Sequence, residues 1–305
     1  MDIAVMGTGG VGAYFGGRLA QAGERVHFIA RGAHLAAIRE RGLRVESRLG
    51  DFVIERPSVT GDPASIGGVD VVLFTVKAQD TRAAAASIRP LLREDTAVIS
   101  LQNGVDNEDV LVGVLGERQV MGGVAYIEAT IAEPGLVVHN SPFARLAFGE
   151  LDGAASRRAQ AFLASCEKAG LEASLSDDIR GVIWTKWLFI CAFSGLTALT
   201  RAPIGRVMAD ADTRELYRRC LAEIAELARA KGIALPEDIV EDRLEFSRKL
   251  HPEMRSSLQQ DLAKGRPLEL DALSGYAGRL GKELGVATPV NDVIYAALKL
   301  HRDGA

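Results

Sequence analysis

The chain has 305 residues, with 36 Lys and Arg against 40 Asp and Glu and a formal net charge of −4 at pH 7. This length is enough for two domains that each bury a hydrophobic core. Because the two signs of charge are interspersed, the sequence has no basic stripe for phosphodiester backbones, and we expect no nucleic-acid partner. The three cysteines lack the paired spacing of a zinc site and the density of a disulfide scaffold, so we expect no structural metal and a reducing compartment.

Two segments bear on where the protein resides. The first strand-like run starts directly after Met1, without a basic segment or a cleavage-type site before it, which predicts a cytoplasmic protein. Residues 181–200 are apolar and long enough to cross a membrane. Because Lys186 lies inside this run and Arg180 and Arg201 flank its opposite ends, we interpret it as a buried helix, with a single membrane span as the alternative.

The first half of the chain alternates short apolar runs with helical stretches. Continuous apolar runs are typical of strands buried on both faces, and they occur at residues 2–6, 25–30, 70–76, 97–101 and 119–123. Helical patterns occupy residues 11–22, 33–40, 81–92 and 155–169. In residues 133–150, turn signals at Pro134-Gly135 and Asn140-Ser141-Pro142 frame two short strands that we expect to form an antiparallel pair at the edge of the sheet. This order predicts a Rossmann-type, doubly wound parallel sheet in a domain of residues 1–176.

Strand-like runs give way to helical patterns after residue 176. Helices are expected at residues 179–199, 213–231, 238–250, 256–264, 270–284 and 290–301, separated by Pro and Gly breaks. The fold class is therefore α/β, with the Rossmann-type domain followed by an all-helical domain of residues 177–305. A homodimer is compatible with this helical half, although no exposed apolar stripe identifies its interface.

A glycine-rich loop follows the first expected strand and opens the first expected helix. Gly7-Thr8-Gly9-Gly10-Val11-Gly12 fits G-x-G-x-x-G, in which the glycines allow a tight turn, close approach of a pyrophosphate and close helix packing. This context predicts a dinucleotide cofactor rather than a structural glycine-rich turn. The second expected strand ends in FIARGAH, where Arg31 stands and an acidic residue for an NAD ribose is missing. Arg31 predicts binding of the 2′-phosphate of NADPH, with an exposed arginine near a helix start as the alternative.

Two further loops follow later strands, and each carries a polar residue. Lys77 lies in TVKA and Asn103 in LQNG. Ligands gather at the carboxyl ends of strands in an open α/β sheet, so both residues are candidates for the cofactor side of the site. A solvated lysine and an ordinary Asn-Gly turn are the alternatives.

WTKWLFICAFSG places one charged residue, Lys186, in an apolar helical stretch. A lysine that lines a mostly dry cleft loses hydration, which favours the neutral amine and suits a proton donor. The alternative is a lysine that extends to the surface from a core helix. Further along, Glu269 or Asp271 is a candidate counter-ion and Ser256 and Ser257 precede a helix, although acids and serines also serve as ordinary helix caps.

Six motifs in order resemble the 2-dehydropantoate 2-reductase (ketopantoate reductase) family over essentially the whole chain: GTGGVGAYFGGRLAQAG, ARGAHLAAIRERGL, TVKA, LQNGV, the WTKW lysine and MRSSLQQDLAKGRPLELD. The resemblance implies that NADPH and a 2-oxo acid bind between a Rossmann domain and a helical domain, and that hydride passes from C4 of the nicotinamide to the keto group. It implies that Lys186 is the general acid and that Glu269 holds the substrate and the charge network together. It also implies that Lys77 and Asn103 contact the cofactor side and orient the lysine, and that Ser257 binds substrate.

The resemblance fails at two positions that concern the substrate. Typical family members carry asparagines four and eight residues after the catalytic lysine, where this chain has Ile190 and Ser194. Loss of an amide removes hydrogen bonds to a hydroxylated substrate. We expect reduction of ketopantoate to (R)-pantoate in pantothenate biosynthesis, with a D-2-hydroxy acid dehydrogenase for aromatic or branched 2-oxo acids as the alternative. A non-catalytic NADPH-binding sensor is a third possibility, but such a sensor has no need of Lys186 and Glu269.

Overall fold

The computed structural model describes residues 1–304. Contacts within the chain define two compact units, one of residues Met1–Gln102 with Asp106–Val182 and one of Asn103–Val105 with Ile183–Ala305. The boundary expected after residue 176 falls shortly before this division.

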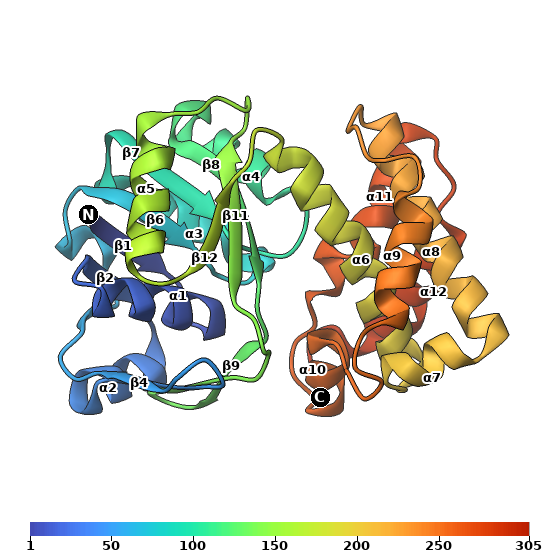
Figure 1. Cartoon of the computed structure of the whole chain (residues 1–305), viewed down its shortest axis with the longest axis horizontal. Coiled ribbons are helices and arrows are strands. Elements are labelled where there is room, and N and C mark those ends of the chain that lie inside the picture. The colour runs from blue at the N-terminus through green and yellow to red at the C-terminus, as the bar shows by residue number, and fades with distance from the viewer. Residues whose placement is uncertain (305) are drawn as a thin grey trace. The chain divides into compact units, whose positions relative to one another are not determined.

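The first unit is built on an eight-stranded sheet in the order β12-β11-β8-β7-β6-β1-β2-β5 (Figure 1). The strands from β5 to β8 run parallel, β11 is antiparallel to β8, and β12 is parallel to β11. The chain order reverses at β1, which pairs with β2 on one side and β6 on the other, so this is the position where open α/β sheets bind ligands. The strands are β1 (Asp2–Met6), β2 (Arg25–Ile29), β5 (Ser58–Thr60), β6 (Val69–Phe74), β7 (Leu92–Ser100), β8 (Val120–Tyr126), β11 (Arg145–Glu150) and β12 (Glu172–Leu175).

Helices cover both faces of this sheet, which confirms the predicted Rossmann-type fold. Alternate residues of β1 belong to different cores, because Ile3 and Val5 pack in one apolar cluster and Ala4 and Met6 in another. The helices are α1 (Gly10–Gln21), α2 (Gly32–Arg41), α3 (Thr81–Ser87), α4 (Asn107–Leu115) and α5 (Arg157–Lys168), with short 3-10 turns η1 (Pro63–Ser65), η2 (Ala78–Asp80), η3 (Arg89–Leu91) and η4 (Glu117–Gln119). The sequence did not predict α4, because its valines and Gly113 have low helix propensity.

A second, four-stranded sheet corrects the expected antiparallel pair at the edge of the main sheet. Its order is β4-β3-β10-β9, formed by β3 (Leu43–Ser47), β4 (Phe52–Ile54), β9 (Ala129–Glu133) and β10 (Leu136–His139). The two strands that we expected to pair are β10 and β11, and they lie in different sheets. Pro134-Gly135 forms the turn between β9 and β10, with Gly135 at φ +87°, so β10 pairs with the strand before it and β11 pairs with β8.

The described residues of the second unit confirm the all-helical prediction. They form most of α6 (Ile179–Thr200), then α7 (Ile204–Ala209), α8 (Ala211–Ala230), α9 (Ile239–Arg248), α10 (Ser257–Ala263), η5 (Glu269–Ala272), α11 (Ser274–Leu284), α12 (Pro289–Leu298) and η6 (Lys299–His301). A buried carboxylate, Glu223 of α8, accepts hydrogen bonds from the backbone N–H groups of Val290 (2.7 Å) and Asn291 (3.0 Å). It also accepts one from the Asn291 side chain (2.7 Å), so α8 supplies the cap of α12.

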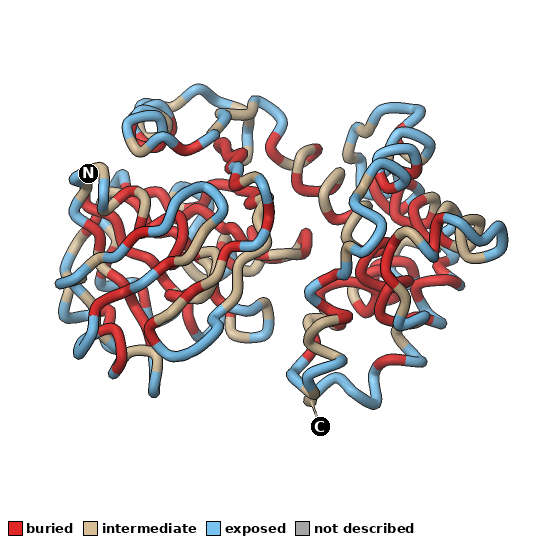
Figure 2. The backbone as a smooth tube through the Cα atoms, turned by 60° about the horizontal axis from the view of Figure 1, so that its bottom comes forward, coloured by how far each residue is buried: buried red, intermediate tan, exposed pale blue. Residues whose placement is uncertain are grey.

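Helix α6 is long and apolar enough to cross a membrane, but 67% of its most apolar window is buried inside the protein. Figure 2 shows buried backbone along much of this helix. Trp187 and Leu188 have no exposed surface. The helix therefore has the burial of a core helix in a globular protein.

Candidate active site

Three loops leave the carboxyl edge of the first unit's sheet at the same level. Met6 pairs with Phe74 across β1 and β6, and Phe74 pairs with Ser100 across β6 and β7. The segments that follow these strands hold the glycine-rich loop, Lys77 and the Gln102-Asn103 pair. The strand register thus brings together three segments that sequence analysis identified separately.

Three glycines of the loop, Gly7, Gly10 and Gly12, are required by the protein itself, because a Cβ on Gly10 would collide with the Ala129 backbone; the fourth, Gly9, faces open space. Gly7 lies at φ +99°, and a Cβ on Gly12 would lie 2.4 Å from the Gly7 carbonyl oxygen and 2.5 Å from Thr75 Oγ1. A Cβ on Gly9 would meet no protein atom within 4 Å. The first helical bond of α1 is donated by the Ala13 N–H to the Gly9 carbonyl, so the preceding N–H groups have no helical acceptor. The loop fits the pyrophosphate of a dinucleotide, because both space and N–H donors are present at this helix start.

Arg31 lies just past β2, at the N-cap of α2, with its side chain 69% exposed. The residues that end β2 provide no carboxylate, as expected from the sequence. The Arg31 guanidinium lies 3.7 Å from a carboxylate oxygen of Asp80 in η2, a contact that sequence analysis did not predict. Because an exposed ion pair of this length is weak, it does not prevent Arg31 from binding a phosphate.

Lys77 and Asn103 differ in their surroundings. Lys77 is exposed and precedes η2, while the neighbouring Thr75 hydroxyl donates a 2.6 Å hydrogen bond to the Gly7 carbonyl. Asn103 is half-buried and precedes Gly104, which lies at φ +115° and requires glycine. The backbone at this position therefore has the glycine-dependent conformation of an Asn-Gly turn, and Asn103 stays a candidate for the cofactor side.

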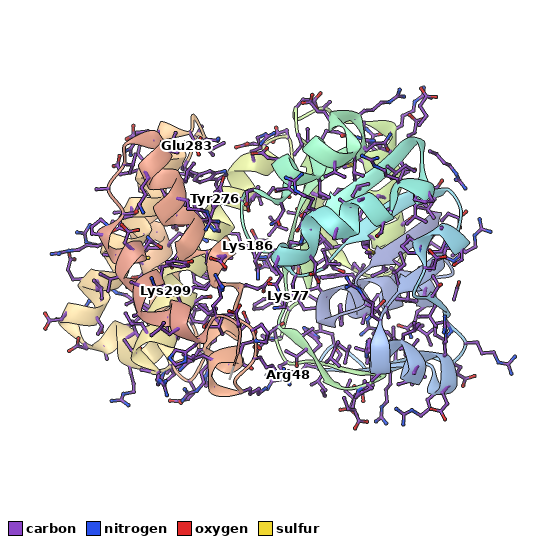
Figure 3. The ribbon with its side chains drawn as sticks, turned by 180° about the vertical axis from the view of Figure 1, so that it is seen from behind. Arg48, Lys77, Lys186, Tyr276, Glu283 and Lys299 are labelled. Carbon is purple, nitrogen blue, oxygen red and sulfur yellow. The ribbon has the colours of Figure 1, made fainter. Side chains whose placement is uncertain are left out.

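Lys186, which is labelled in Figure 3, lies half-buried on α6. Ile190, one turn later, is also half-buried. Ser194 and Thr197, which share this face by helical spacing, are 5% and 0% exposed. The partly exposed part of the face therefore ends after Ile190. The adjacent Trp187 is fully buried, and its indole N–H donates a 3.0 Å hydrogen bond to the Ala272 carbonyl in η5.

The acid and serine candidates differ in their burial and in the hydrogen bonds of their side chains. Glu269 is half-buried at the start of η5, whereas Asp271 accepts a 2.9 Å hydrogen bond from the Tyr295 hydroxyl and lies near two arginines. Ser256 caps α10 and lies 2.8 Å from the Thr197 hydroxyl. Ser257 is exposed at the first position of that helix. The capping alternative thus holds for Ser256, while Ser257 and Glu269 remain the candidates.

A buried carboxyl that the sequence does not reveal lies close to the strand-end loops. Glu108 is 4% exposed in the first turn of α4, and it hydrogen-bonds to the Ser100 hydroxyl. Burial raises the pKa of the Glu108 carboxyl from 4.5 to about 7. No sequence signal separates this residue from the neighbouring acids in DNED, because its burial depends on how α4 packs.

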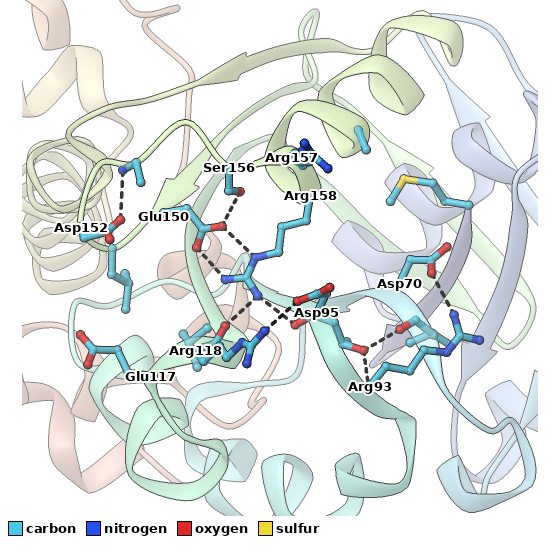
Figure 4. A pocket seen from close by; sticks show the side chains of 17 residues that line it. Asp70, Arg93, Asp95, Glu117, Arg118, Glu150, Asp152, Ser156, Arg157 and Arg158 are labelled. Carbon is cyan, nitrogen blue, oxygen red and sulfur yellow. Dashed lines mark hydrogen bonds and ion pairs between the residues drawn. The ribbon is translucent and has the colours of Figure 1, made fainter.

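A hollow of about 850 Å³ in the first unit lies at the opposite edge of the sheet, where β6, β7 and β8 begin (Figure 4). Its charged side chains are largely paired with one another. Arg158 forms a two-point ion pair with Glu150 at 2.7 and 2.6 Å, and Arg93 lies 2.9 Å from Asp70. The hollow contains none of the predicted site residues, and its internal pairing indicates a structural role.

Comparisons with known proteins agree with the fold and the motifs. Residues 3–153 match the family model described as Ketopantoate reductase PanE/ApbA, and residues 178–302 match Ketopantoate reductase PanE/ApbA C terminal. The chain is 31% identical over 320 residues to the 2-dehydropantoate 2-reductase of Mesorhizobium japonicum, covering 98% of this chain and 97% of that protein.

Solved structures extend the agreement to three dimensions. A PanE/ApbA family ketopantoate reductase from Ralstonia eutropha JMP134 is 36% identical with a TM-score of 0.90, covering 99% of this chain and 98% of that one. The ternary structure of D-mandelate dehydrogenase with NADH and anilino(oxo)acetate shares the fold at 24% identity and a TM-score of 0.89, covering 99% and 98% of the two chains. The chain therefore belongs to the ketopantoate reductase PanE/ApbA family of oxidoreductases.

Proposed function

We propose that the protein is an NADPH-dependent reductase of a 2-oxo acid, with 2-dehydropantoate (ketopantoate) as the first candidate substrate and (R)-pantoate, for pantothenate synthesis, as its product. The observation that carries the proposal is the setting of Lys186. This lysine is half-buried on α6 and is followed by Trp187, whose hydrogen bond connects α6 to η5, the turn that begins with Glu269. Lys186 on α6 and Glu269 on η5 therefore belong to two elements of the second unit that a buried hydrogen bond connects.

The cofactor side of the proposed site consists of the loop Gly7–Gly12, Arg31, Lys77 and Asn103. The bound cofactor supplies hydride from C4 of its nicotinamide ring. The open space at Gly9 and the donors at the start of α1 suit the pyrophosphate, and Arg31 suits the 2′-phosphate that distinguishes NADPH from NADH. Lys77 and Asn103 follow the two adjacent strands, where they orient the ligand.

Arg31→Ala tests the choice of cofactor. Loss of charge-assisted hydrogen bonds to the 2′-phosphate should lower kcat/KM for NADPH by about tenfold or more. The value for NADH, which has no such phosphate, should change little. Equal losses with both cofactors would contradict the assignment of Arg31 to the phosphate.

Lys186 acts as the general acid in the proposed reaction. As the keto carbon accepts hydride, its oxygen gains negative charge, and the Lys186 ammonium donates a proton to that oxygen to form the hydroxyl. The Glu269 carboxylate balances the positive charge of Lys186 and helps to hold the substrate. Ser257 and Asn103 donate hydrogen bonds to the substrate. Lys186→Met should lower kcat by about 10²–10⁴-fold.

The decisive experiment measures NADPH oxidation by the wild type and by Lys186→Met over a panel of 2-oxo acids, together with NADPH binding by fluorescence titration. Unchanged binding with lost turnover supports the general-acid role. Equal turnover by both proteins would contradict that role. A wild type that binds NADPH and turns over no 2-oxo acid would instead indicate the non-catalytic sensor.

An aromatic or branched 2-oxo acid is the second candidate substrate, because apolar groups flank Lys186. Ile190 and Phe189 are half-buried on the same part of α6. Phe189 stacks on Phe193 at 5.3 Å between ring centroids and meets the edge of Phe246 at the same distance. The same fold also occurs in D-mandelate dehydrogenase.

Substrate preference separates the two candidates. The kcat/KM for ketopantoate should exceed those for phenylglyoxylate and branched 2-oxo acids if the first candidate is correct. Ile190→Asn restores an amide at the position of the family's asparagine, and it should shift the ratio of kcat/KM values towards ketopantoate by about tenfold. A wild type that prefers the aromatic acid would transfer the assignment to the second candidate without changing the mechanism.

A further inference from the structure

The side chain of Gln102 connects the ends of two adjacent strands of the first unit. Its amide nitrogen donates a 2.9 Å hydrogen bond to the Val76 carbonyl and a 2.8 Å hydrogen bond to the Thr81 hydroxyl. The Thr81 hydroxyl in turn donates a 2.8 Å hydrogen bond to the Ala78 carbonyl. One amide group thus holds both ends of the segment 76–81, and Lys77 lies inside that segment.

This connection begins where the backbone hydrogen bonds of the sheet end. The last backbone bond between the two strands joins the Leu101 N–H to the Phe74 carbonyl at 2.9 Å. Beyond that point, the side chain of Gln102 adds hydrogen bonds between the end of β7 and the segment after β6. Gln102 is the next residue after Leu101, and Asn103 follows it directly, so the same backbone positions both Gln102 and Asn103.

The hydrogen bonds of Gln102 are buried, which makes their loss costly. Gln102 is 8% exposed and Thr81 is 3% exposed. On the other side of the amide, the Ser100 hydroxyl lies 3.5 Å from the Gln102 carbonyl oxygen and is itself fully buried. An apolar side chain in place of Gln102 would leave a buried carbonyl and a buried hydroxyl without this donor.

We propose that Gln102 is a positioning residue of the reductase, whose amide sets the spacing between the Lys77 segment and Asn103 and thereby the geometry of the cofactor side of the site. The inference rests on the proposed function, because that function assigns Lys77 and Asn103 to cofactor and substrate. Gln102 itself need not touch either ligand.

Gln102→Met tests this role, with Thr96→Val as the matched control. Methionine keeps the length of the side chain and removes its donors. Thr96 is 1% exposed in the middle of β7, and its hydroxyl donates a 2.6 Å hydrogen bond to the carbonyl of Val69, the first residue of β6. Both variants therefore lose a buried hydrogen bond in the same sheet, but only one of them lies at the edge that carries the loops. Assays are performed at a temperature at which denaturation curves show that all the proteins are folded.

The expected result is a rise of about tenfold in the KM and dissociation constant for NADPH and a fall in kcat for Gln102→Met, with wild-type values for Thr96→Val. Wild-type kinetics and NADPH affinity in Gln102→Met would overturn the inference, as would equal losses in the two variants, because these outcomes indicate a purely structural role. If the wild type reduces no 2-oxo acid, the proposed function fails. NADPH affinity then still decides whether Gln102 positions the cofactor side.

Discussion

Replacing Glu108 with Gln should stabilise the protein relative to the wild type by an amount that grows with pH. Burial raises the pKa of the Glu108 carboxyl from 4.5 to about 7, although the Ser100 hydroxyl and the start of α4 both favour the ionised form. Between these two pH values the folded protein holds a proton that the unfolded chain has released. Wild-type stability therefore falls as pH rises through this window, and the shift corresponds to about 3 kcal/mol of unfolding free energy.

Urea denaturation at several pH values from about 4.5 to about 8 measures this effect. Both tryptophans, Trp184 and Trp187, lie in the second unit, so far-UV circular dichroism is needed to follow the first unit. Glu117→Gln removes an exposed carboxylate beyond the end of α4 and controls for the change of charge. The stability of Glu108→Gln minus that of the wild type should rise by about 3 kcal/mol across the range, well above the change in the control. A difference that stays constant with pH would refute the argument that burial keeps this carboxyl protonated.

Three further substitutions test the loop, a buried cap and the support of Lys186. The new methyl group of Gly9→Ala would meet no protein atom, so the unfolding free energy should change by less than about 1 kcal/mol. The methyl group would occupy the space proposed for the pyrophosphate, so a fluorescence titration should show NADPH binding weakened at least about tenfold. Gly113→Ala, whose surroundings are equally open, should bind NADPH normally, and similar losses in both would contradict the loop assignment. Glu223→Ala should lower the unfolding free energy measured in urea by about 3 kcal/mol, because three donors at the start of α12 lose their acceptor. A loss below about 1 kcal/mol would show that water replaces the Glu223 carboxylate as acceptor. Trp187→Phe removes the donor to the Ala272 carbonyl and should cost about 1–3 kcal/mol and lower kcat, whereas unchanged kcat would exclude a role in supporting Lys186.

The parts of the fold that could be predicted are those whose signal is local. The runs 2–6 and 70–76 are continuously apolar because β1 and β6 are covered on both faces, and Pro and Gly mark the breaks between helices of the second unit. The small second sheet could not be predicted in the same way. Its strand β10 pairs in parallel with β3, which lies far away in the sequence. Neither strand contains a sequence pattern that indicates which strand it pairs with.

The candidate site shows the same difference between local and long-range features. Gly7 and Gly12 could be identified because their roles depend on backbone conformation and on close approach within one βα unit. The contact of Arg31 with Asp80 and the hydrogen bonds of Gln102 could not be identified, because they join segments whose proximity depends on strand register. Sequence motifs thus predict residues whose role is set within one βα unit better than residues whose contacts join distant segments.

In the proposed reaction, proton donation and substrate choice depend on separate positions of α6. Lys186, the proposed proton donor, is followed by Trp187, a fully buried side chain with a hydrogen bond to η5, so the core of the second unit fixes the backbone next to Lys186. Ser194 is 5% exposed, which leaves little surface for a substrate at the second asparagine position of the family, whereas Ile190 is half-buried. If the proposed function is correct, a substitution at Ile190 should therefore change which 2-oxo acid fits while the core contacts next to Lys186 stay intact. For this reason the substrate should depend more on Ile190 than on Ser194, and family members that share the lysine can differ in the acid that they reduce.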